Sequence, residues 1–504
     1  MKKLNLPKIV LISFAFFVAT AIVSSAQTFT TLLNFNGGNG SSPGDSIIQG
    51  TDGNFYGVTT YGGSKTCSKG CGTVFGITPK GQISTVKFNG SSGVAPVGGV
   101  LQSTNGNFYG TTYSGGTTEN GIVFEVASGG TLSTLHNFDL KDGSSPNSPL
   151  IEGFDGGLYG TTFGQSGSNG TVFKITPAGA LTTLYAFCAD KYPRCSDGAR
   201  PEGGLLLAPN GNFYGVTTNG GTGPFCTAAV DGCGTVFELT PTGTLTTLYN
   251  FCSQTACADG SYPIGGLVQG PNGNLYGTTE WGGTNPCIIV SIDYGCGIVF
   301  ELTPQGQFTN LHNFCSEINC ADGSYPENTM VLGTDGDLYG TATNGALTYC
   351  VDGGSGCGTI FRITKGGTFA ILHTFSGGDG GSPDGLVQST NGSFYGTTTE
   401  GGVNFCGVLG LNFGCGTFFS LDVDLGPFVH PLLNFGSVGS TVEILGTNLT
   451  GATGVTFNGS SASFTVASSS YIEASVPTGA TTGTVEVTTP SGTLSSNVPF
   501  QVLP

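Results

Sequence analysis

The residues best suited to ligand recognition occupy one repeated position in the chain. Aligned on a recurring Tyr-Gly string, this position holds Tyr61, Ser114, Gly164, Asn219, Trp281, Asn344 and Glu400. Variation among aromatic, amide and carboxylate types at the start of a long loop is typical of a ligand surface. With Glu280, which adjoins the only tryptophan, the types suit a saccharide, and the candidate binding residues are Tyr61, Asn219, Glu280, Trp281, Asn344 and Glu400. The alternative is that they are ordinary solvated loop residues.

Acid–base chemistry has fewer candidates. Glu280, Glu327 and Glu400 are carboxylates in loop regions, and such groups perform general acid and base catalysis where two of them converge. The sequence does not show that any two converge. It contains no nucleophile motif, phosphate-binding loop or zinc signature, so no catalytic residue is assigned, and no cofactor or metal is expected.

Histidines and turn aspartates have structural explanations. His136, His312 and His373 share one repeat position with Tyr185, Tyr249 and Leu33, which predicts a packing or rim role, and His430 falls in a linker. Asp-Gly-x-x-Pro turns begin at Asp142, Asp197, Asp259, Asp322 and Asp379. One acid per turn favours a plain β-turn over a calcium site, which needs clustered oxygens.

Three short motifs each recur seven times. Phe/Leu-Tyr-Gly recurs around Tyr56, Tyr109, Tyr159, Tyr214, Tyr276, Tyr339 and Tyr395, at intervals of 50 to 63 residues. Gly-x-hydrophobic-Phe ends at Phe75, Phe124, Phe173, Phe237, Phe300, Phe361 and Phe419, and a β-rich run ends at Phe35, Phe88, Phe138, Phe187, Phe251, Phe314 and Phe375. Each period contains four strand-like runs, with Asp-Gly or Asn-Gly between the first two, a dipeptide that favours a two-residue hairpin. The pattern predicts an all-β fold, a seven-bladed β-propeller over residues 27–424.

The order of the runs predicts how the propeller closes. The run 28–35 is of the fourth type and precedes all others, whereas the last repeat ends at its third run near Phe419. The N-terminal strand is therefore expected to complete the last blade, which removes free sheet edges.

Sixteen cysteines fall into eight close pairs. Five pairs lie between the second and third runs and three lie between repeats: Cys67/Cys71, Cys226/Cys233, Cys287/Cys296, Cys350/Cys357, Cys406/Cys415, Cys188/Cys195, Cys252/Cys257 and Cys315/Cys320. Pairing within one loop predicts disulfides. In four-stranded antiparallel blades both kinds of loop emerge on one face, so all the sulfur and the binding site are expected there.

Composition and the first residues bound the location and partners. Lys2, Lys3 and Lys8 precede an apolar run and the small residues 24–26, which predicts a signal peptide over residues 1–26 and export without membrane insertion after cleavage. Loss of three lysines would change the net charge from −17 to −20. Such acidity disfavours nucleic acid as a partner, and a monomer is expected.

The repeats resemble a known family. Gly273 to Pro304, with the strings Gly-Asn-Leu-Tyr-Gly-Thr-Thr and Cys-Gly-Ile-Val-Phe-Glu-Leu-Thr-Pro, is similar to the GloVer tandem repeats of exported bacterial proteins. The similarity recurs from Gln27 to about Asp422, although repeats two and three lack loop cysteines. The resemblance implies no activity. Residues 425–504 form short alternating runs and resemble an IPT/TIG immunoglobulin-like β-sandwich, a spacer or interaction module.

These observations rank three functions. The first is a secreted or cell-surface binding protein that recognises glycans or an exported or envelope protein through the disulfide-bearing loops. The second is an extracellular polysaccharide lyase or hydrolase with an acidic site on the same face. The third is a structural protein of the cell envelope. Convergent buried carboxylates on that face would favour the enzyme.

Overall fold

The computed structural model describes residues 27–165, 168–190, 195–226, 233–289, 292–345, 356–406 and 414–504. The expected signal peptide, residues 1–26, and Cys350 lie outside the described residues. In the described ranges the regular structure is almost entirely β-strand, with two short 3-10 turns, η2 (Thr255–Cys257) and η3 (Ile318–Cys320). Among the described residues, no helix is long and apolar enough to span a membrane.

Seven antiparallel sheets follow one another along the described chain, one for each sequence repeat. The first four contain β2 (Ser41–Pro43), β3 (Ile48–Gln49), β4 (Phe55–Tyr61), β5 (Thr73–Ile77) and β6 (Ile83–Lys87); β7 (Val100–Gln102), β8 (Phe108–Thr112), β9 (Ile122–Val126) and β10 (Leu132–Asn137); β11 (Ile151–Glu152), β12 (Leu158–Thr162), β13 (Thr171–Ile175) and β14 (Leu181–Ala186); and β15 (Leu206–Leu207), β16 (Phe213–Thr217), β17 (Thr235–Leu239) and β18 (Leu245–Asn250).

The last three repeat sheets have the same strand order. They contain β19 (Val268–Gln269), β20 (Leu275–Thr279), β23 (Ile298–Leu302) and β24 (Phe308–Asn313); β25 (Val331–Leu332), β26 (Leu338–Ala342), β27 (Thr359–Ile363) and β28 (Phe369–Thr374); and β29 (Gly381–Gln388), β30 (Phe394–Glu400), β31 (Thr417–Asp422) and β1 (Thr28–Asn34). A separate hairpin is formed by β21 (Ile288–Ile289) and β22 (Ile292–Asp293). Below, the strands of each repeat are called a to d in chain order.

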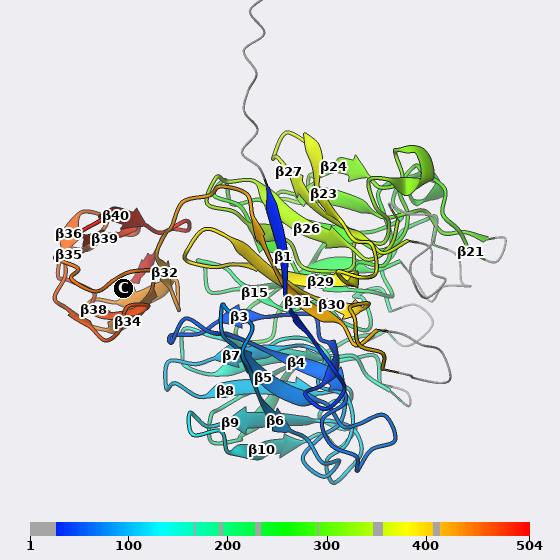
Figure 1. Ribbon diagram of the computed structural model, residues 1–504. Coiled ribbons are helices and arrows are strands. Elements are labelled where there is room, and N and C mark those ends of the chain that lie inside the picture. Colours follow the sequence, from blue (N-terminus) through cyan, green and yellow to red (C-terminus); the bar gives the residue numbers. More distant parts are fainter. Residues whose placement is uncertain are drawn as a thin grey trace, which may run out of the picture.

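The N-terminal strand pairs where the order of the runs predicted. β1 is antiparallel to β31, from Thr28 opposite Asp422 to Asn34 opposite Thr417, and Figure 1 shows it (dark blue) beside the last repeat sheet. The Phe29 ring stacks on His373 with centroids 3.7 Å apart. The expected pairing of the segment from Thr28 with the segment near Phe419 is confirmed.

The glycine of the Tyr-Gly motif leaves space for the phenylalanine ring of strand c in the same repeat. A Cβ atom built on Gly277 would lie 2.6 Å from the Phe300 ring, and the same clash recurs in all seven repeats, at distances of 2.5 to 2.8 Å. Only glycine leaves room for the ring, which then fills the core of its sheet. The two motifs therefore recur together because they form one packing unit.

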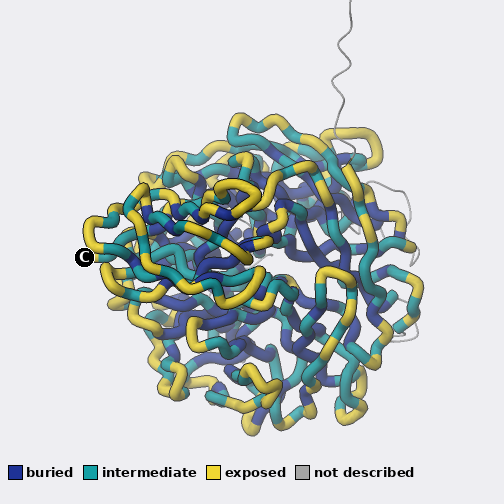
Figure 2. The backbone as a smooth tube through the Cα atoms, turned by 60° about the vertical axis from the view of Figure 1, so that its left-hand side comes forward, coloured by how far each residue is buried: buried dark blue, intermediate teal, exposed yellow. Residues whose placement is uncertain are grey.

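Each repeat sheet contacts the next one, and the last contacts the first. On strand b the tyrosine of one repeat packs on the next repeat's aromatic residue, as in Tyr56–Phe108, Tyr159–Phe213 and Tyr339–Phe394, and Tyr395 packs on Phe55 with centroids 4.1 Å apart. Near the start of strand a the backbones also approach closely, as at Gly385, where an added Cβ would lie 2.1 Å from the Asp45 carbonyl oxygen. Figure 2 shows the resulting distribution, with buried segments inside and exposed turns at the periphery.

Turns between strands a and b carry a repeated hydrogen-bond network. Where the turn holds aspartate, it accepts the tyrosine hydroxyl of strand b: Tyr56 to Asp52, Tyr159 to Asp155 and Tyr339 to Asp335, at 2.7 to 2.9 Å. Where the turn holds asparagine, a strand-c glutamate accepts instead: Tyr109 to Glu125, Tyr214 to Glu238 and Tyr276 to Glu301, at 2.8 to 3.0 Å. In these six repeats each tyrosine hydroxyl thus donates to a carboxylate, which satisfies its hydrogen-bonding capacity.

The C-terminal segment forms further sheets around a core of its own. One sheet contains β32 (His430–Pro431), β34 (Thr441–Leu445), β37 (Phe464–Val466) and β38 (Tyr471–Ser475), and another contains β35 (Gly454–Phe457), β36 (Ser460–Ser461), β39 (Val485–Thr489) and β40 (Gly492–Ser495), while β33 (Phe435–Ser437) pairs in parallel with β41 (Gln501–Leu503). Ile444 and Ile472 of the first sheet share a core with Phe457 and Val487 of the second. His430 was predicted in a linker, but it lies in β32 opposite Leu445, so that prediction is wrong. Its strand is short and the flanking prolines hid it.

This C-terminal sandwich lies over the a–b turns (Figure 1). Ser470 donates to the Thr51 carbonyl oxygen at 2.9 Å, and Thr447 and Thr390 share a hydroxyl hydrogen bond. Phe435 packs on Phe154 with centroids 4.2 Å apart, and Gln501 and Asn497 bond the carbonyls of Pro209 and Leu332. The sandwich therefore contacts the a–b turns of four repeats and the end of strand a, at Leu332, in a fifth.

Candidate functional site

Loops between strands b and c and between repeats lie together at the other end of the sheets. Their backbones form bridges, for example between Ser261 and Trp281 and between Ser324 and Asn344. The described residues contain seven of the predicted disulfides: Cys67–Cys71, Cys188–Cys195, Cys226–Cys233, Cys252–Cys257, Cys287–Cys296, Cys315–Cys320 and Cys406–Cys415. All are in these loops, so we call this end the disulfide-bearing face. The eighth predicted pair includes Cys350 and stays a prediction.

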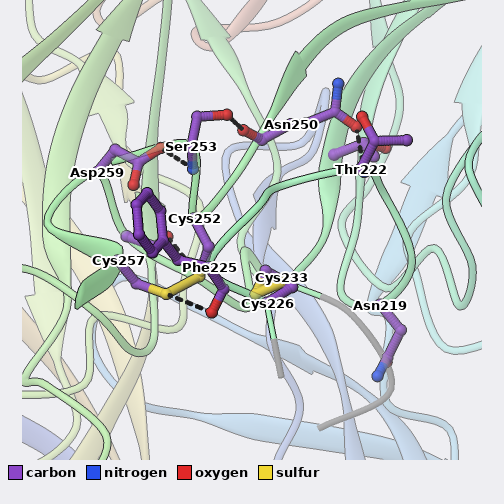
Figure 3. The surroundings of a disulfide bond; sticks show 12 residues. Asn219, Thr222, Phe225, Cys226, Cys233, Asn250, Cys252, Ser253, Cys257 and Asp259 are labelled. Carbon is purple, nitrogen blue, oxygen red and sulfur yellow. Dashed lines mark hydrogen bonds between the residues drawn. A yellow bond between two sulfur atoms is a disulfide. The ribbon is translucent and has the colours of Figure 1, made fainter. Parts of the chain in front are cut away.

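Two neighbouring loops bring their disulfides into contact. In the fourth repeat Cys226–Cys233 lies beside Cys252–Cys257, and Phe225, whose carbonyl oxygen is 4.0 Å from the Cys257 Sγ atom, lies against the second disulfide (Figure 3). In the fifth repeat the Sγ atoms of Cys287 and Cys315 are 3.6 Å apart. These sulfur atoms would be close enough to share a metal ion, but oxidised sulfur lacks the thiolate that binds metals. Each bridge instead closes its own loop, and the contact between bridges packs adjacent loops against each other.

Aspartates of the Asp-Gly-x-x-Pro turns hold the loops between repeats. Each accepts one donor from strand d, namely His136 to Asp142, Tyr185 to Asp197, Tyr249 to Asp259, His312 to Asp322 and His373 to Asp379, at 2.7 to 3.1 Å. Each also accepts backbone N–H groups of its own loop, as Asp259 does from Ser253 in Figure 3. These contacts agree with the roles predicted from the sequence, which are a plain β-turn for the aspartates and a packing or rim position for the histidines.

In each of the seven repeats a proline ends the turn that leads into the sheet, and the residue before this proline has a left-handed backbone conformation. Ser42, Ala95, Ser145, Arg200, Tyr262, Tyr325 and Ser382 have φ between 48° and 60°. Such non-glycine conformations cost free energy and concentrate at functional sites. Each backbone N–H donates to the preceding repeat's b–c loop at 2.7 to 3.2 Å, and in five repeats the acceptor is a cysteine carbonyl: Cys415, Cys71, Cys233, Cys296 and Cys357. The b–c cysteines therefore support this ring of strained residues directly.

Inside the ring is the central cavity. It comprises a space of about 400 Å³ and an adjoining one of about 310 Å³, which share Asp45, Ile264, Glu327 and Asn328 in their walls. The first is lined by residues of six repeats, including Glu202, and the second by Asp384 and Asn344. The walls come from the segment that follows the turn proline, where strand a begins.

The cavity concentrates negative charge in a protein interior. Burial, with repulsion from Asp45, raises the pKa of Glu327 to about 7. Burial, with repulsion from Asp45 and Glu327, raises that of Glu202 to about 7, although Arg200 opposes the rise. Burial and repulsion from Glu327 and Glu202 raise the pKa of Glu280 to about 8. These carboxyl groups therefore exchange protons near neutral pH.

Asp45 and Asp384 differ in their access to water. Burial raises the pKa of both, and Asp45 also raises that of Asp384 by repulsion. Asp45 is solvent-exposed as a residue, and its pKa rises to about 7 against an opposing backbone hydrogen bond, whereas Asp384 is only 4% exposed. The Oδ1 atom of Asp384 accepts the Gly385 N–H at 3.0 Å, and its Oδ2 atom has no hydrogen-bond partner.

Aromatic side chains adjoin the acids. The Tyr262 ring stacks on Trp281 with centroids 4.4 Å apart, and Trp281 also contacts Tyr294. Glu202 and Glu280 are close enough to Tyr262 to raise the pKa of its hydroxyl to about 12, after burial as the main cause. Carboxylates and aromatic faces thus meet in repeats four to six, a combination that binds sugar rings or cations.

The candidate residues from the sequence separate into three groups. Asn344 lines the central cavity, and Glu280, with Trp281 next to it in the chain, is close enough to Glu327 and Glu202 to interact with them electrostatically. Tyr61 and Glu400 line a smaller pocket of about 120 Å³ between the first and last repeats. Asn219 is 4% exposed, and its Oδ1 accepts the Thr218 hydroxyl at 2.9 Å.

Sequence reasoning missed Asp45, Glu202 and Asp384 as a group. Alignment on Tyr-Gly places them at unrelated points, but alignment on the turn proline places Glu202, Glu327 and Asp384 directly after it. The same alignment places Arg200, Tyr262 and Tyr325 directly before it, against serine or alanine elsewhere. Repeats four to six therefore have a larger side chain before this proline than the other repeats have.

Raised carboxyl pKa values predict the pH dependence of stability. The folded protein keeps protons on Glu202, Glu280 and Glu327 at pH values where the unfolded chain, with a pKa of 4.5, has lost them. Folding therefore binds protons, and the free energy of unfolding falls as pH rises from about 5 to 8. Glu327→Gln should raise the free energy of unfolding at pH 8 by at least about 1 kcal/mol. Urea unfolding of wild type and Glu327→Gln at about pH 5 and about pH 8 measures these free energies. A wild-type free energy of unfolding that does not fall between the two pH values would contradict the prediction.

Comparisons with known proteins agree with this architecture. The family model described as Gloeobacter/Verrucomicrobia repeat matches residues 18–229, 64–291 and 224–469. A comparison with curated proteins finds no significant match. Among solved structures, a fungal alcohol oxidase of the AA5 family in complex with copper is 11% identical, with a TM-score of 0.51, and covers 95% of this chain and 99% of its own. Virginiamycin B lyase from Staphylococcus aureus is 14% identical, with a TM-score of 0.49, and covers 79% of this chain and 99% of its own.

What these comparisons establish is family and fold. At 11% identity a likeness concerns the fold alone, and here it spans both the repeat sheets and the C-terminal sandwich. The overlapping family matches together cover most of the sequence. The chain therefore belongs to the Gloeobacter/Verrucomicrobia repeat family.

Proposed function

We propose that this chain is an exported seven-bladed β-propeller that binds a saccharide in its central cavity, from the disulfide-bearing face. In this proposal residues 1–26 are a cleaved signal peptide, residues 27–424 form the propeller, and residues 425–504 form an IPT/TIG-like domain. Contacts between every pair of successive sheets, and between the last and the first, support a closed ring of seven blades. The seven disulfides indicate an oxidising environment, and they support export.

One observation carries the binding site. Carboxylates from separate repeats, Glu202, Glu327 and Asp384, line one cavity. Glu202 is close enough to Tyr262 to raise the pKa of its hydroxyl, and the Tyr262 ring stacks on Trp281. Saccharide sites combine flat aromatic surfaces for the sugar ring with hydrogen-bond acceptors for its hydroxyls. The C-terminal sandwich occupies the opposite face, which leaves the disulfide-bearing face as the route of entry.

A glycan array tests this proposal. Wild-type protein should bind a defined set of saccharides, and Trp281→Ala should weaken that binding by about tenfold or more, since loss of an aromatic anchor commonly costs over 1 kcal/mol. Tyr61→Ala, in the smaller pocket between the first and last repeats, is the matched aromatic control and should retain affinity. Equal binding by wild type and Trp281→Ala would remove Trp281 from the site.

The acid cluster favours a second candidate, a polysaccharide lyase or hydrolase. Glu280 and Glu327 have pKa values of about 8 and 7, so each can donate or accept a proton near neutral pH. If catalysis occurs, Glu280→Gln and Glu327→Gln should each lower kcat by about 10²-fold or more. Reducing ends and unsaturated sugar products, followed on a panel of polysaccharides, measure this. Turnover unaffected by either substitution would exclude these residues as acid and base.

A further inference from the structure

The negative charge of the central cavity is not balanced by the protein. Asp45, Glu202, Glu280, Glu327 and Asp384 act on one another electrostatically, whereas Arg200 is the only cation that acts on any of them in the described structure. Among the described residues, none of the ion pairs within 4.0 Å includes one of these five acids. Buried acids are normally paired, so this group lacks a counterion.

Asp384 gives independent evidence for a ligand. Its side chain is 4% exposed, it lines the cavity with Asp45 and Glu327, and its Oδ2 atom has no hydrogen-bond partner. The equivalent oxygens of the five turn aspartates all accept hydrogen bonds. An unpaired buried carboxylate oxygen costs free energy, and a donor from a ligand in the cavity would remove this cost.

The spacing of the acids favours an organic cation over a bare metal ion. Outside the cysteine groups, no three potential metal-binding side chains of the described residues bring their ligand atoms within 4.8 Å of one another. A metal ion needs several oxygens at 2.0–2.6 Å, whereas an ammonium group has three diverging donors and can sit between acids that are farther apart. The stacked Tyr262 and Trp281 rings offer a flat surface for the rest of such a ligand.

We propose that the ligand is an amino saccharide whose free ammonium group lies among Asp384, Glu327 and Asp45 in the central cavity. This proposal rests on the proposed saccharide-binding function and names its ligand class. The ammonium donates to the buried, unpartnered Oδ2 atom of Asp384, and its charge balances the neighbouring acids. The sugar ring lies toward Tyr262 and Trp281 of repeat five.

Binding must then be coupled to proton release. The titratable and charged groups around the ammonium are Asp45, Glu202, Glu280, Glu327, Asp384, Tyr262 and Arg200. A cation favours the ionised carboxyl groups, several of which are partly protonated at about pH 7. Affinity should therefore rise from about pH 5 to 7 and decline where the ammonium itself loses its proton.

Calorimetry with matched sugars tests the proposal. The probes are a β-1,4-linked glucosamine oligomer and its N-acetylated counterpart, in which an acetyl group on each nitrogen removes the charge of the amine. At about pH 6, where the amines still carry their protons, wild-type protein should bind the free-amine oligomer about tenfold or more tightly, with proton release visible as a buffer-dependent heat. Glu327→Gln and Asp384→Asn should each reduce this affinity by about tenfold or more. Glu317→Gln removes an exposed acid of the disulfide-bearing face and should change affinity by less than about twofold.

The outcomes separate the two proposals. Equal affinity for both oligomers, or binding of the free-amine oligomer without proton release, would overturn the ammonium assignment and leave saccharide binding intact. If neither oligomer binds, the ammonium assignment is overturned. If, in addition, no saccharide on the glycan array binds, the saccharide-binding proposal is overturned as well. A lysine-rich peptide that binds where both oligomers fail would identify a protein ligand instead. Circular dichroism and melting of each variant confirm that it is folded, and Asp384→Asn preserves side-chain shape.

Discussion

Deleting residues 28–35 should abolish the stable monomeric fold, the largest effect that we expect from any change in this chain. The deletion removes β1 and leaves Thr417–Asp422 unpaired on one side. It also removes Phe35, which is 0% exposed in the core between the first and last repeats. Loss of a buried phenylalanine side chain alone costs about 3–5 kcal/mol, against a total stability of about 5–15 kcal/mol. Thermal melting and size-exclusion chromatography measure the loss.

The exposed edge should also change how the truncated protein behaves. An unpaired, apolar strand edge recruits other strands, so soluble oligomers or aggregates are expected. A synthetic peptide of residues 27–36, added in trans, should restore a monomeric complex with a raised Tm by adding the missing strand. A truncated protein that stays monomeric with the wild-type Tm would show that β1 does not hold the last sheet to the first.

Asp322→Ala should be the most destabilising substitution on the disulfide-bearing face, by about 3–5 kcal/mol. Asp322 is 1% exposed and accepts hydrogen bonds from the His312 ring, the Ser316 hydroxyl and two backbone N–H groups. Removing it leaves four donors without an acceptor. Glu317→Gln, an exposed acid in the same loop, is the control and should stay within about 0.5 kcal/mol of wild type. Chemical unfolding at neutral pH measures both, and an equal effect of the two substitutions would contradict the role assigned to Asp322.

The contribution of Asp322 should disappear in acid. Burial alone would raise its pKa, but hydrogen bonds from His312 and Ser316 hold the pKa below its usual value of 3.8. A lowered carboxyl pKa stabilises the fold above the unfolded pKa, and this stabilisation is lost as pH falls through the folded value. The difference between wild type and Asp322→Asn should therefore narrow below about pH 4. The cavity acids act with the opposite sign, because their pKa values are raised.

Local motifs predicted the repeat sheets well because each motif is itself a packing unit. Gly277 and Phe300 must occur together, since the ring occupies the space of a Cβ atom. The disulfides were also predictable, because each joins cysteines within a single loop. The side chains of the site were less predictable. Glu280 and Trp281 were identified beside a loop, but Asp45 and Asp384 come from repeats at opposite ends of the chain.

By itself, the sequence determined the strands, their turns, the cysteine pairs and the place of the N-terminal strand, because all of these depend on residues a short distance apart or on a period that repeats. Only the tertiary structure decided that Asp45, Glu202, Glu327 and Asp384 face one cavity, and that the C-terminal sandwich covers the a–b turns. The reason is physical: the charge and burial that shift a carboxyl pKa depend on distances in space, and those distances exist only once the first and last repeat sheets are in contact.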